Sequence, residues 1–495
     1  MLDDVLAPLD VIEDPWRQAY HLCPPLGLLN DPNGLTFWRG AYHVFYQWNP
    51  HGCGHENKHW AHVRSTDLIH WEWLPPALAP DAPYDEDGCY SGCAVELGGD
   101  LFLMYSGNVR SADGGRESYQ CLARSRDGVG FEKLGPVING ALPGYTGHFR
   151  DPKAWRHGDR WYAVLGAQRN DLTGTVLLLE SPDLCEWHSV GELIQPAPPC
   201  YMYECPDLFT LDGRTVLVCC QQVLEASADG TRRSDVAGYM LGWVDLERAR
   251  FPHSGFHKLD QGFDFYAPQT LLGPDGRRLL IGWMGLPVQP QTPSVDSGWT
   301  HCLTLPRELT LEGDQLMQRP ARELARLRSM AIRVPDVDMD ANTAFVLPQP
   351  DGGAWELDLS IRAARGADWV LHLFDSEQQS LSLVFDGAGG RLTLQRHCPA
   401  AGQLHESRTC EMGGAVTRLQ VFIDRSSAEI FVNDGVAVFT TRCYPTARPE
   451  APRLLARQAL TLHDIHVWPL EDRLTRVGPA PRFHPTKKKR RRRET

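Results

Sequence analysis

Asn30-Asp31-Pro32-Asn33-Gly34 belongs to the pattern that decides the fold, because related segments return four more times along the chain. Each segment combines a polar or small residue with Pro or Gly and then enters a strand-like run. The copies begin at Asp31-Pro32, Ser91-Gly92, Asp151-Pro152, Cys205-Pro206 and Ala267-Pro268, at intervals of 60, 60, 54 and 62 residues. A repeat of this length indicates one supersecondary unit used five times.

Every copy continues through a turn into a second β-rich run, which is the signal of a hairpin. These second runs are Tyr42–Gln47, Leu101–Ser106, Trp161–Gly166, Thr215–Cys220 and Leu279–Met284. A further turn is expected in four of the units, at Asp67, Asp127, Asp183 and Asp245. Five such units, none able to bury both faces alone, predict a five-bladed β-propeller over residues 15–318. An irregular β-sandwich with coincidental spacing is the alternative.

The remainder of the chain follows a different pattern. Residues 319–340 are predicted to link the propeller to a second domain, and residues 341–470 alternate as in a β-sandwich. Seven sandwich strands are expected, at Trp355–Ile361, Trp369–Phe374, Leu381–Phe385, Leu392–Arg396, Thr417–Ile423, Ala428–Val432 and Val436–Thr441. Residues 471–495 are Pro-rich and basic, which predicts a disordered tail. The fold class is therefore expected to be all-β.

The composition of the chain argues against several classes of protein. The 495 residues are 42% hydrophobic and 22% charged, which is typical of a globular protein. Without the bases Lys487–Arg493 and Glu494, the remaining 42 basic and 61 acidic residues give a net charge of −19, which argues against a nucleic-acid partner. No apolar run approaches the roughly 18 residues that a membrane span needs. Fourteen Cys without a C-x-x-C pair, and no signal peptide in Met1–Pro15, predict a cytoplasmic protein with free thiols.

Acidic residues recur at the repeated segment. In a propeller the first strand of each unit lines the central funnel, so Asp31, Asp151 and Glu204 are expected to converge at one end. A lone Asp-Pro is more often a turn initiator, but matched copies at one register favour a site. The repeated segments contain no Asp-x-Asp-x-Asp loop and no His pair at helical spacing that would complete a metal cage around these acids, so no metal is predicted. Glycoside hydrolysis instead requires two carboxyl groups that flank one bond.

These segments resemble motifs of glycoside hydrolase family 32, which comprises invertases, sucrose-6-phosphate hydrolases, inulinases and levanases. The resemblance runs from about His21 to Leu470. It rests on Leu29–Gly34, Phe45-Tyr46-Gln47-x-Asn49-Pro50, Trp60-x-His62, Phe149–Pro152, Tyr203–Asp207, Phe265–Gln269, Trp283-Met284-Gly285 and Asp424-Arg425-Ser426-Ser427-x-Glu429-x-Phe431. Two small-for-small departures occur, because Ala61 and Cys93 stand where many members have Gly and Ser.

The resemblance implies a five-bladed propeller followed by a sandwich, and a retaining enzyme that needs no cofactor. It makes Asp31 the nucleophile, Glu204 the acid/base, and Asp151 the residue that holds fructose hydroxyls. The negative charges of Asp31 and Asp151 are expected to favour the protonated form of Glu204. The remaining residues expected at the fructose site are Asn30, Gln47, Trp60, Ser91, Arg150 and Trp283.

The predicted reaction is hydrolysis of the terminal β-fructofuranoside of sucrose or sucrose 6-phosphate, with the sugar as the small-molecule partner. The pattern His55-x-x-Lys58-His59-Trp60 resembles that of the bacterial sucrose-6-phosphate hydrolases, so Lys58 is expected to meet the phosphate, with His55 or Arg110 as further donors. A solvated Lys58 without this role is the alternative. Inulinase or levanase activity, fructosyl transfer and a non-catalytic carbohydrate-binding propeller also remain open, and the sequence indicates no oligomeric state.

Overall fold

A computed structural model describes residues 14–111, 114–194, 200–227, 230–288, 292–376, 379–445 and 450–472. Nearly all regular structure in these residues is β. The helical elements are four short 3-10 helices, η2 (Pro293–Ser297), η3 (Arg322–Leu327), η4 (Pro399–Ala401) and η5 (Asn433–Gly435). Within the described ranges, no helix has the length and apolarity to cross a membrane. Most of the predicted basic tail, residues 473–495, lies outside the described residues.

Residues 27–320 form five sheets, each of which contains one copy of the repeated segment in its first strand. The first sheet holds β1 (Gly27–Trp38), β2 (Ala41–Asn49), β3 (His59–Ser65), β4 (Glu72–Leu78) and the short β19 (Trp299–Thr300). The second holds β5 (Cys89–Leu97), β6 (Asp100–Arg110), β7 (Arg116–Ser125) and β8 (Glu132–Ile138). The third holds β9 (Tyr145–His157), β10 (Arg160–Arg169), β11 (Gly174–Ser181) and β12 (His188–Glu192).

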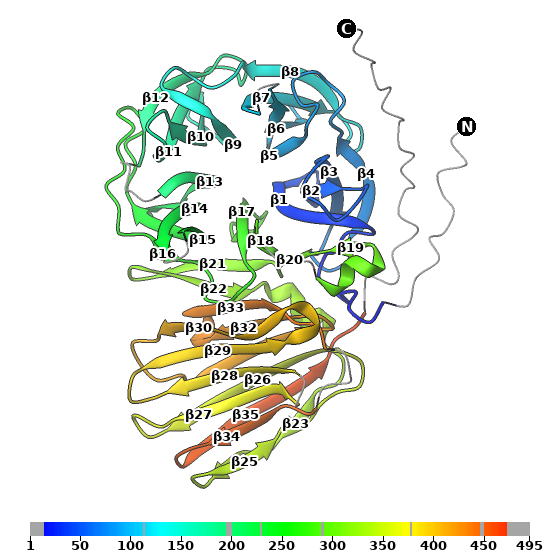
Figure 1. The fold of residues 1–495 in the computed structure, drawn as a ribbon, viewed down its shortest axis with the longest axis vertical. Coiled ribbons are helices and arrows are strands. Elements are labelled where there is room, and N and C mark those ends of the chain that lie inside the picture. The colour runs from blue at the N-terminus through cyan, green and yellow to red at the C-terminus, as the bar shows by residue number, and fades with distance from the viewer. Residues whose placement is uncertain are drawn as a thin grey trace, which may run out of the picture.

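The fourth sheet holds β13 (Cys200–Leu211), β14 (Arg214–Ser227), β15 (Gly230–Gly242) and β16 (His257–Lys258). The fifth holds β17 (Tyr266–Leu272), β18 (Arg278–Met284), β20 (Cys302–Leu303), β21 (Arg307–Glu312) and β22 (Gln315–Pro320). The first strands contact one another in a closed ring, β1 to β5, β9, β13, β17 and back to β1. Figure 1 shows these strands around a common centre, so polar side chains far apart in sequence meet there.

Each repeated segment forms an irregularity in the strand that faces the centre. The pairing register slips at Leu29/Pro32 in β1, at Tyr90/Gly92 in β5, opposite Val164/Gly166 in β9, at Glu204/Asp207 in β13 and at Tyr266/Gln269 in β17. Proline has no N–H to give to a ladder, so it fits such a bulge. Asp151, Cys205 and Ala267, each before a proline, have φ of 66°, 49° and 46°. The recurring dipeptide therefore re-aims side chains toward the centre rather than simply ending a strand.

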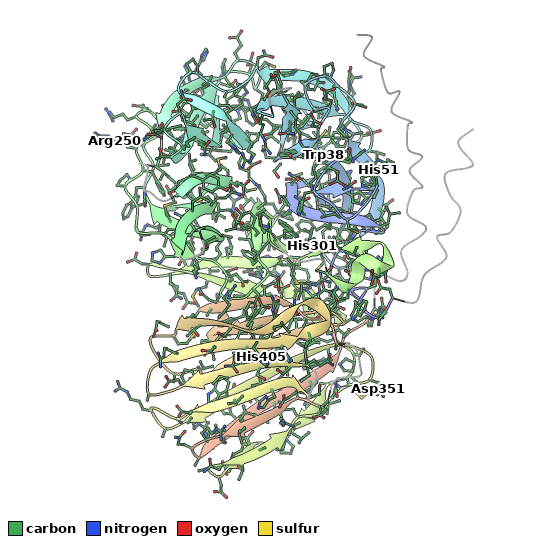
Figure 2. The ribbon with its side chains drawn as sticks, in the orientation of Figure 1. Trp38, His51, Arg250, His301, Asp351 and His405 are labelled. Carbon is green, nitrogen blue, oxygen red and sulfur yellow. The ribbon has the colours of Figure 1, made fainter. Side chains whose placement is uncertain are left out.

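The recurring aspartates that were expected at turns have equivalent contacts. Oδ1 of Asp67 accepts from the backbone N–H groups of the residues two and three positions later, Ile69 and His70. Asp127, Asp183 and Asp245 do the same in their own sheets. This side-chain-to-backbone bonding closes a turn locally. Apolar side chains fill the space between neighbouring sheets, among them Trp38, which is labelled in Figure 2.

Residues 332–469 form two sheets that share one apolar core. One sheet holds β23 (Ile332–Val334), β24 (Val337–Met339), β26 (Ala354–Ala363), β31 (Arg418–Asp424), β32 (Ser427–Val432), β33 (Ala437–Arg442) and β35 (Leu460–Pro469). The other holds β25 (Thr343–Val346), β27 (Trp369–Asp375), β28 (Ser380–Asp386), β29 (Arg391–Cys398), β30 (Gln403–Glu411) and β34 (Arg453–Ala456). All seven expected strands are present. Six further strands were not predicted, namely β23, β24, β25, β30, β34 and β35. Of these, β30 is a mostly exposed edge strand with few apolar residues.

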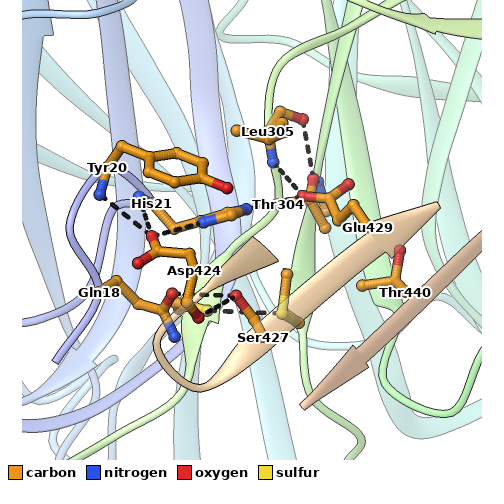
Figure 3. A network of polar contacts seen from close by, with 12 residues as sticks. Gln18, Tyr20, His21, Thr304, Leu305, Asp424, Ser427, Glu429 and Thr440 are labelled. Carbon is orange, nitrogen blue, oxygen red and sulfur yellow. Dashed lines mark hydrogen bonds and ion pairs between the residues drawn. The ribbon is translucent and has the colours of Figure 1, made fainter. Parts of the chain in front are cut away.

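A buried polar network joins the two parts of the chain (Figure 3). Asp424 accepts from the backbone N–H groups of Ala19, Tyr20 and His21 at 2.7, 3.1 and 3.1 Å, and from His21 Nδ1 at 2.9 Å. Glu429 accepts from His21 Nε2 at 3.0 Å and from Arg307 Nη2 at 2.6 Å. All four side chains are fully buried. The acidic residues of the motif Asp424–Phe431 therefore stabilise the contact between the two parts of the chain and do not form a catalytic centre.

Candidate active site

The bulged strands enclose a cavity of about 220 Å³. Its lining residues are Asn30, Asp31, Gln47, His55, Lys58, Tyr90, Arg116, His148, Arg150, Asp151, Tyr201, Glu204, Gln222, Tyr266, Trp283 and Pro287. A larger hollow, of about 870 Å³, lies at the opposite ends of the same strands, but the three predicted acids do not line it. The cavity thus collects nine of the residues that the sequence predicted for the site.

Three side chains donate hydrogen bonds from oxygen or nitrogen to Asp31. Ser91 Oγ and Gln47 Nε2 donate to its Oδ2 at 2.5 and 3.3 Å, and Asn30 Nδ2 donates to Oδ1 at 3.0 Å. Burial raises the pKa of Asp31, while the bonds from Ser91 and Asn30 and the charge of Lys58 oppose that rise. The donors orient the carboxylate and stabilise its ionised form.

Glu204 faces the same cavity from the fourth sheet. Arg150 Nη2 donates to its Oε1 at 2.6 Å, and Gln222 Nε2 and Tyr266 Oη donate to Oε2 at 2.5 and 2.7 Å. Each donor favours the ionised carboxylate. The sequence-based expectation considered only the neighbouring acids, which favour the protonated form, and missed this opposing ion pair with Arg150.

Asp151 lies close to both other acids, whose charges act on it. Its backbone N–H donates to Ser106 Oγ at 2.9 Å, and its Oδ2 accepts from the Cys205 N–H at 3.1 Å. Cys205 Sγ is 3.7 Å from Asp31 Oδ2 and 3.8 Å from Asp151 Oδ2, so the two aspartates flank one sulfur. Burial raises the pKa of Asp151 to about 7, with Arg150 opposing the rise and the charges of Glu204 and Asp31 adding to it.

Lys58 lies beside the nucleophile candidate rather than in solvent. Its Nζ donates to Asn30 Oδ1 at 2.5 Å, and the residue is only 3% exposed. Burial lowers the pKa of Lys58 to about 7, against the opposing charge of Asp31. Burial and the charge of Lys58 lower the pKa of His55 to about 3, so His55 is neutral. Arg110 is exposed at the end of β6 and is not among the lining residues.

Two of the predicted site residues stand behind the wall of the cavity. Trp60 is fully buried, and its Nε1 donates to the Tyr90 carbonyl at 3.1 Å. Ser91, also buried, accepts from Gln47 Nε2 at 2.6 Å while it donates to Asp31. Both residues position groups that line the cavity.

Several lining residues were not predicted for the site. They are Tyr90, Arg116, His148, Tyr201, Gln222, Tyr266 and Pro287. Tyr90 and Tyr266 each precede a recurring bulge, which was a usable signal. Gln222 lies on the second strand of its sheet, as Gln47 does, just beyond the apolar run that marked that strand. Arg116 and His148 carry no signal of this kind, because only packing of β7 against β9 brings them to the cavity.

The comparison with known families explains this arrangement. The sequence model described as glycosyl hydrolases family 32 N-terminal domain matches residues 21–320, and the model described as the family 32 C terminal matches residues 323–469. The chain belongs to glycosyl hydrolase family 32. It is therefore a glycoside hydrolase, and the acids that line its cavity lie within the family's N-terminal domain.

Individual relatives agree with this assignment. The chain is 42% identical to a sucrose-6-phosphate hydrolase of Bacillus subtilis over 87% of its length and 90% of the relative. It is 45% identical to one of Klebsiella pneumoniae, covering 88% and 90%. A solved sucrose-6-phosphate hydrolase of Lactobacillus gasseri superposes with a TM-score of 0.82 at 31% identity, covering 93% and 94% of the two chains. A Bombyx mori β-fructofuranosidase mutant in complex with sucrose gives 0.80 at 32% identity, covering 93% and 95%.

Proposed function

We propose that this family 32 member hydrolyses the terminal β-D-fructofuranoside bond of sucrose 6-phosphate, and of sucrose, with retention of configuration. The observation that carries the proposal is the convergence of Asp31, Asp151 and Glu204, each at the bulge of a different sheet, on one small polar cavity. Two carboxyl groups that flank one glycosidic bond are the catalytic groups of most glycosidases.

In the first step a carboxylate oxygen of Asp31 attacks the anomeric carbon of fructose. The bond from that carbon to the glucose oxygen breaks, and Glu204 gives its proton to the departing oxygen. In the second step water attacks the same carbon while the Glu204 carboxylate takes a proton from that water, and Asp31 leaves as a carboxylate. Ser91, Gln47 and Asn30 hold Asp31 in its ionised form for the attack.

Asp151 is assigned to the fructose hydroxyls. It lies beside Asp31 across the Cys205 sulfur and is 3% exposed, so a sugar that reaches Asp31 also reaches Asp151. Asn30, Gln47, Lys58 and Trp283 complete the fructose side of the cavity, and His55 packs against Trp283 with ring centroids 5.8 Å apart. No cofactor takes part in the proposed steps.

We also propose that the five sheets of residues 27–320 are the blades of a β-propeller and that the two later sheets form a β-sandwich. The ring of first-strand contacts supports the propeller. β23 and β24, inside the segment expected as a linker, pair with β35, which supports a start of the sandwich near residue 332. All fourteen cysteines are free thiols, which supports an intracellular site of action.

A side-by-side assay on sucrose 6-phosphate, sucrose, raffinose and inulin tests the function. We expect the highest kcat/KM on sucrose 6-phosphate, lower values on sucrose and raffinose, and the lowest on inulin. Higher activity on inulin than on the disaccharides would make the protein a fructan hydrolase. Correctly folded protein without activity on any of the four would leave a carbohydrate-binding module as the better description.

A further inference from the structure

The two sides of the cavity differ in what they offer a substrate. In the proposed reaction, on which this inference rests, Asp31 marks the fructose unit and Glu204 marks the oxygen of the departing glucose unit. A phosphate on that glucose must therefore lie beyond Glu204, away from Asp31. Lys58, the cation expected to meet the phosphate, bonds to Asn30 beside Asp31, so it lies on the fructose side.

Two arginines line the cavity near Glu204, namely Arg150, which pairs with Glu204, and Arg116. Arg116 begins β7 and lines the cavity, and its guanidinium lies over the ring of Tyr90, 5.3 Å from the centroid. Burial lowers the pKa of Arg116, and so does the nearby charge of Arg150, while the charges of Glu204 and Asp151 oppose this effect. Arg116 is therefore close enough to Glu204 and Asp151 to interact with their charges.

The charge of Arg116 is not neutralised by a close partner. Asp151 and Glu204 both pair with Arg150, and among the residues that the structure describes Arg116 forms no ion pair. Its face is covered by Tyr90, a contact that leaves the N–H groups of a guanidinium directed outward in its plane. Five donors in a planar fork suit the oxygens of a phosphate monoester.

His148 lies next to Arg116 because the backbones of β9 and β7 approach each other closely at Gly147. A Cβ on Gly147 would lie 1.9 Å from the Arg116 carbonyl oxygen, so the glycine lets β9 approach the start of β7 closely. Arg150 Nη1 lies 3.0 Å from His148 Nδ1, and because arginine only donates, this nitrogen accepts. The proton of His148 is then on the other ring nitrogen, Nε2, and the residue lines the same cavity.

We infer that Arg116, assisted by His148, binds the 6-phosphate of the glucose unit and gives the enzyme its preference for phosphorylated sucrose. Arg116 and His148 are specificity-determining residues in this assignment and take no part in bond cleavage. Lys58 then supports the fructose site, where it acts on phosphorylated and unphosphorylated substrates alike.

The test compares kcat/KM for sucrose 6-phosphate and for sucrose in the wild type and in Arg116→Met. We expect the ratio of the two values to fall at least tenfold in the variant. Glucose 6-phosphate, used as a product inhibitor beside glucose, should lose its advantage over glucose by a similar factor. His148→Gln should lower the ratio less. Arg116→Lys keeps a positive charge but lacks the planar set of guanidinium donors, so we expect a ratio of kcat/KM values between those of the wild type and Arg116→Met. This second variant still tests the inference if Arg116→Met does not fold.

Arg110→Met is the matched control. Arg110 pairs with Arg116 across β6 and β7 but is exposed and does not line the cavity, so the substrate ratio should stay at the wild-type value. Lys58→Met should lower both activities and leave their ratio unchanged. A folded Arg116→Met enzyme that keeps the wild-type ratio would overturn the inference alone. A wild-type enzyme without preference for sucrose 6-phosphate would overturn the proposed substrate as well.

Discussion

Removal of the Tyr266 hydroxyl should move the alkaline limb of the pH–rate profile to higher pH. Tyr266 Oη donates to Glu204 Oε2 at 2.7 Å. Burial and the charge of Glu204 raise the pKa of Tyr266 well above its usual value of about 10, so the phenol remains a donor over any practical assay range. The bond therefore stabilises the ionised form of Glu204 at every pH at which the enzyme is tested.

The size of the shift follows from the strength of this bond. A hydrogen bond to a charged group is worth about 1.5–3 kcal/mol, and one pH unit corresponds to about 1.4 kcal/mol. The acid step needs protonated Glu204, and Tyr266→Phe destabilises the competing ionised form. The carboxyl then keeps its proton to higher pH, and the alkaline limb of kcat/KM should rise by about 1–2 pH units. Arg150 and Gln222 continue to donate to Glu204, so the limb should persist.

The assay is kcat/KM for sucrose between pH 4 and 10, where unfolding is excluded by a parallel spectroscopic measurement. Tyr203→Phe is the control, because Tyr203 is buried in the same sheet as Glu204 but its hydroxyl accepts from Gln221 Nε2 at 3.4 Å. The acid limb, which reports ionisation of the nucleophile, should not move with Tyr266→Phe. An unmoved alkaline limb, or an equal shift in Tyr203→Phe, would refute the assignment of Glu204 as the acid held by this contact.

Three further predictions concern the acids and the junction. Asp31→Asn and Glu204→Gln should each lower kcat by several orders of magnitude with the fold intact; a substrate with a good leaving group should partly rescue only Glu204→Gln, and near-normal turnover by either variant would contradict the proposed mechanism. Glu429→Gln breaks a fully buried ion pair with Arg307 and should lower the free energy of unfolding by about 3–5 kcal/mol in urea titrations; a loss below about 1 kcal/mol would show that the pair is not needed. Burial lowers the pKa of His21, but its bonds to the buried carboxylates of Asp424 and Glu429 raise that pKa overall. The contribution of His21 to the free energy of unfolding should therefore be complete below about pH 6.5 and fade as the pH rises through the pKa of His21 in the folded protein. His21→Gln should remove this pH dependence.

The repeat could be predicted from sequence because it depends on local chemistry. A proline has no N–H and disrupts a ladder wherever it stands, and an aspartate that bonds to the N–H groups two and three residues later closes its turn without outside help. For this reason the residue types of Asp31-Pro32 and Asp151-Pro152 are enough to indicate strand irregularities, and Asp67 and its counterparts are enough to indicate turns. The strand β30 was missed because an exposed edge has no apolar alternation to detect, whereas β35 has buried apolar residues and was also not predicted.

The electrostatics of the site depended on contacts between sheets. The sequence indicated that Asp31, Asp151 and Glu204 would converge, but not that Arg150, one residue before Asp151, would pair with Glu204 at 2.6 Å. Nor did it indicate that Lys58 would be buried against Asn30, since burial belongs to the environment and not to the residue.

The five-fold repeat follows from residue types at a fixed spacing, and the family and the expected acids follow from the resemblance of these segments to family motifs, so both can be predicted from the chain alone. Which cation faces which half of the substrate depends instead on tertiary packing. Arg116 and His148 reach the cavity because β7 packs against β9 at Gly147, and Lys58 lies beside Asp31 because its Nζ bonds to Asn30 on β1. The difference is one of range: hydrogen-bonded turns and bulges are set within a few residues, whereas the direction of a long charged side chain is set by neighbours that the chain brings together from different sheets.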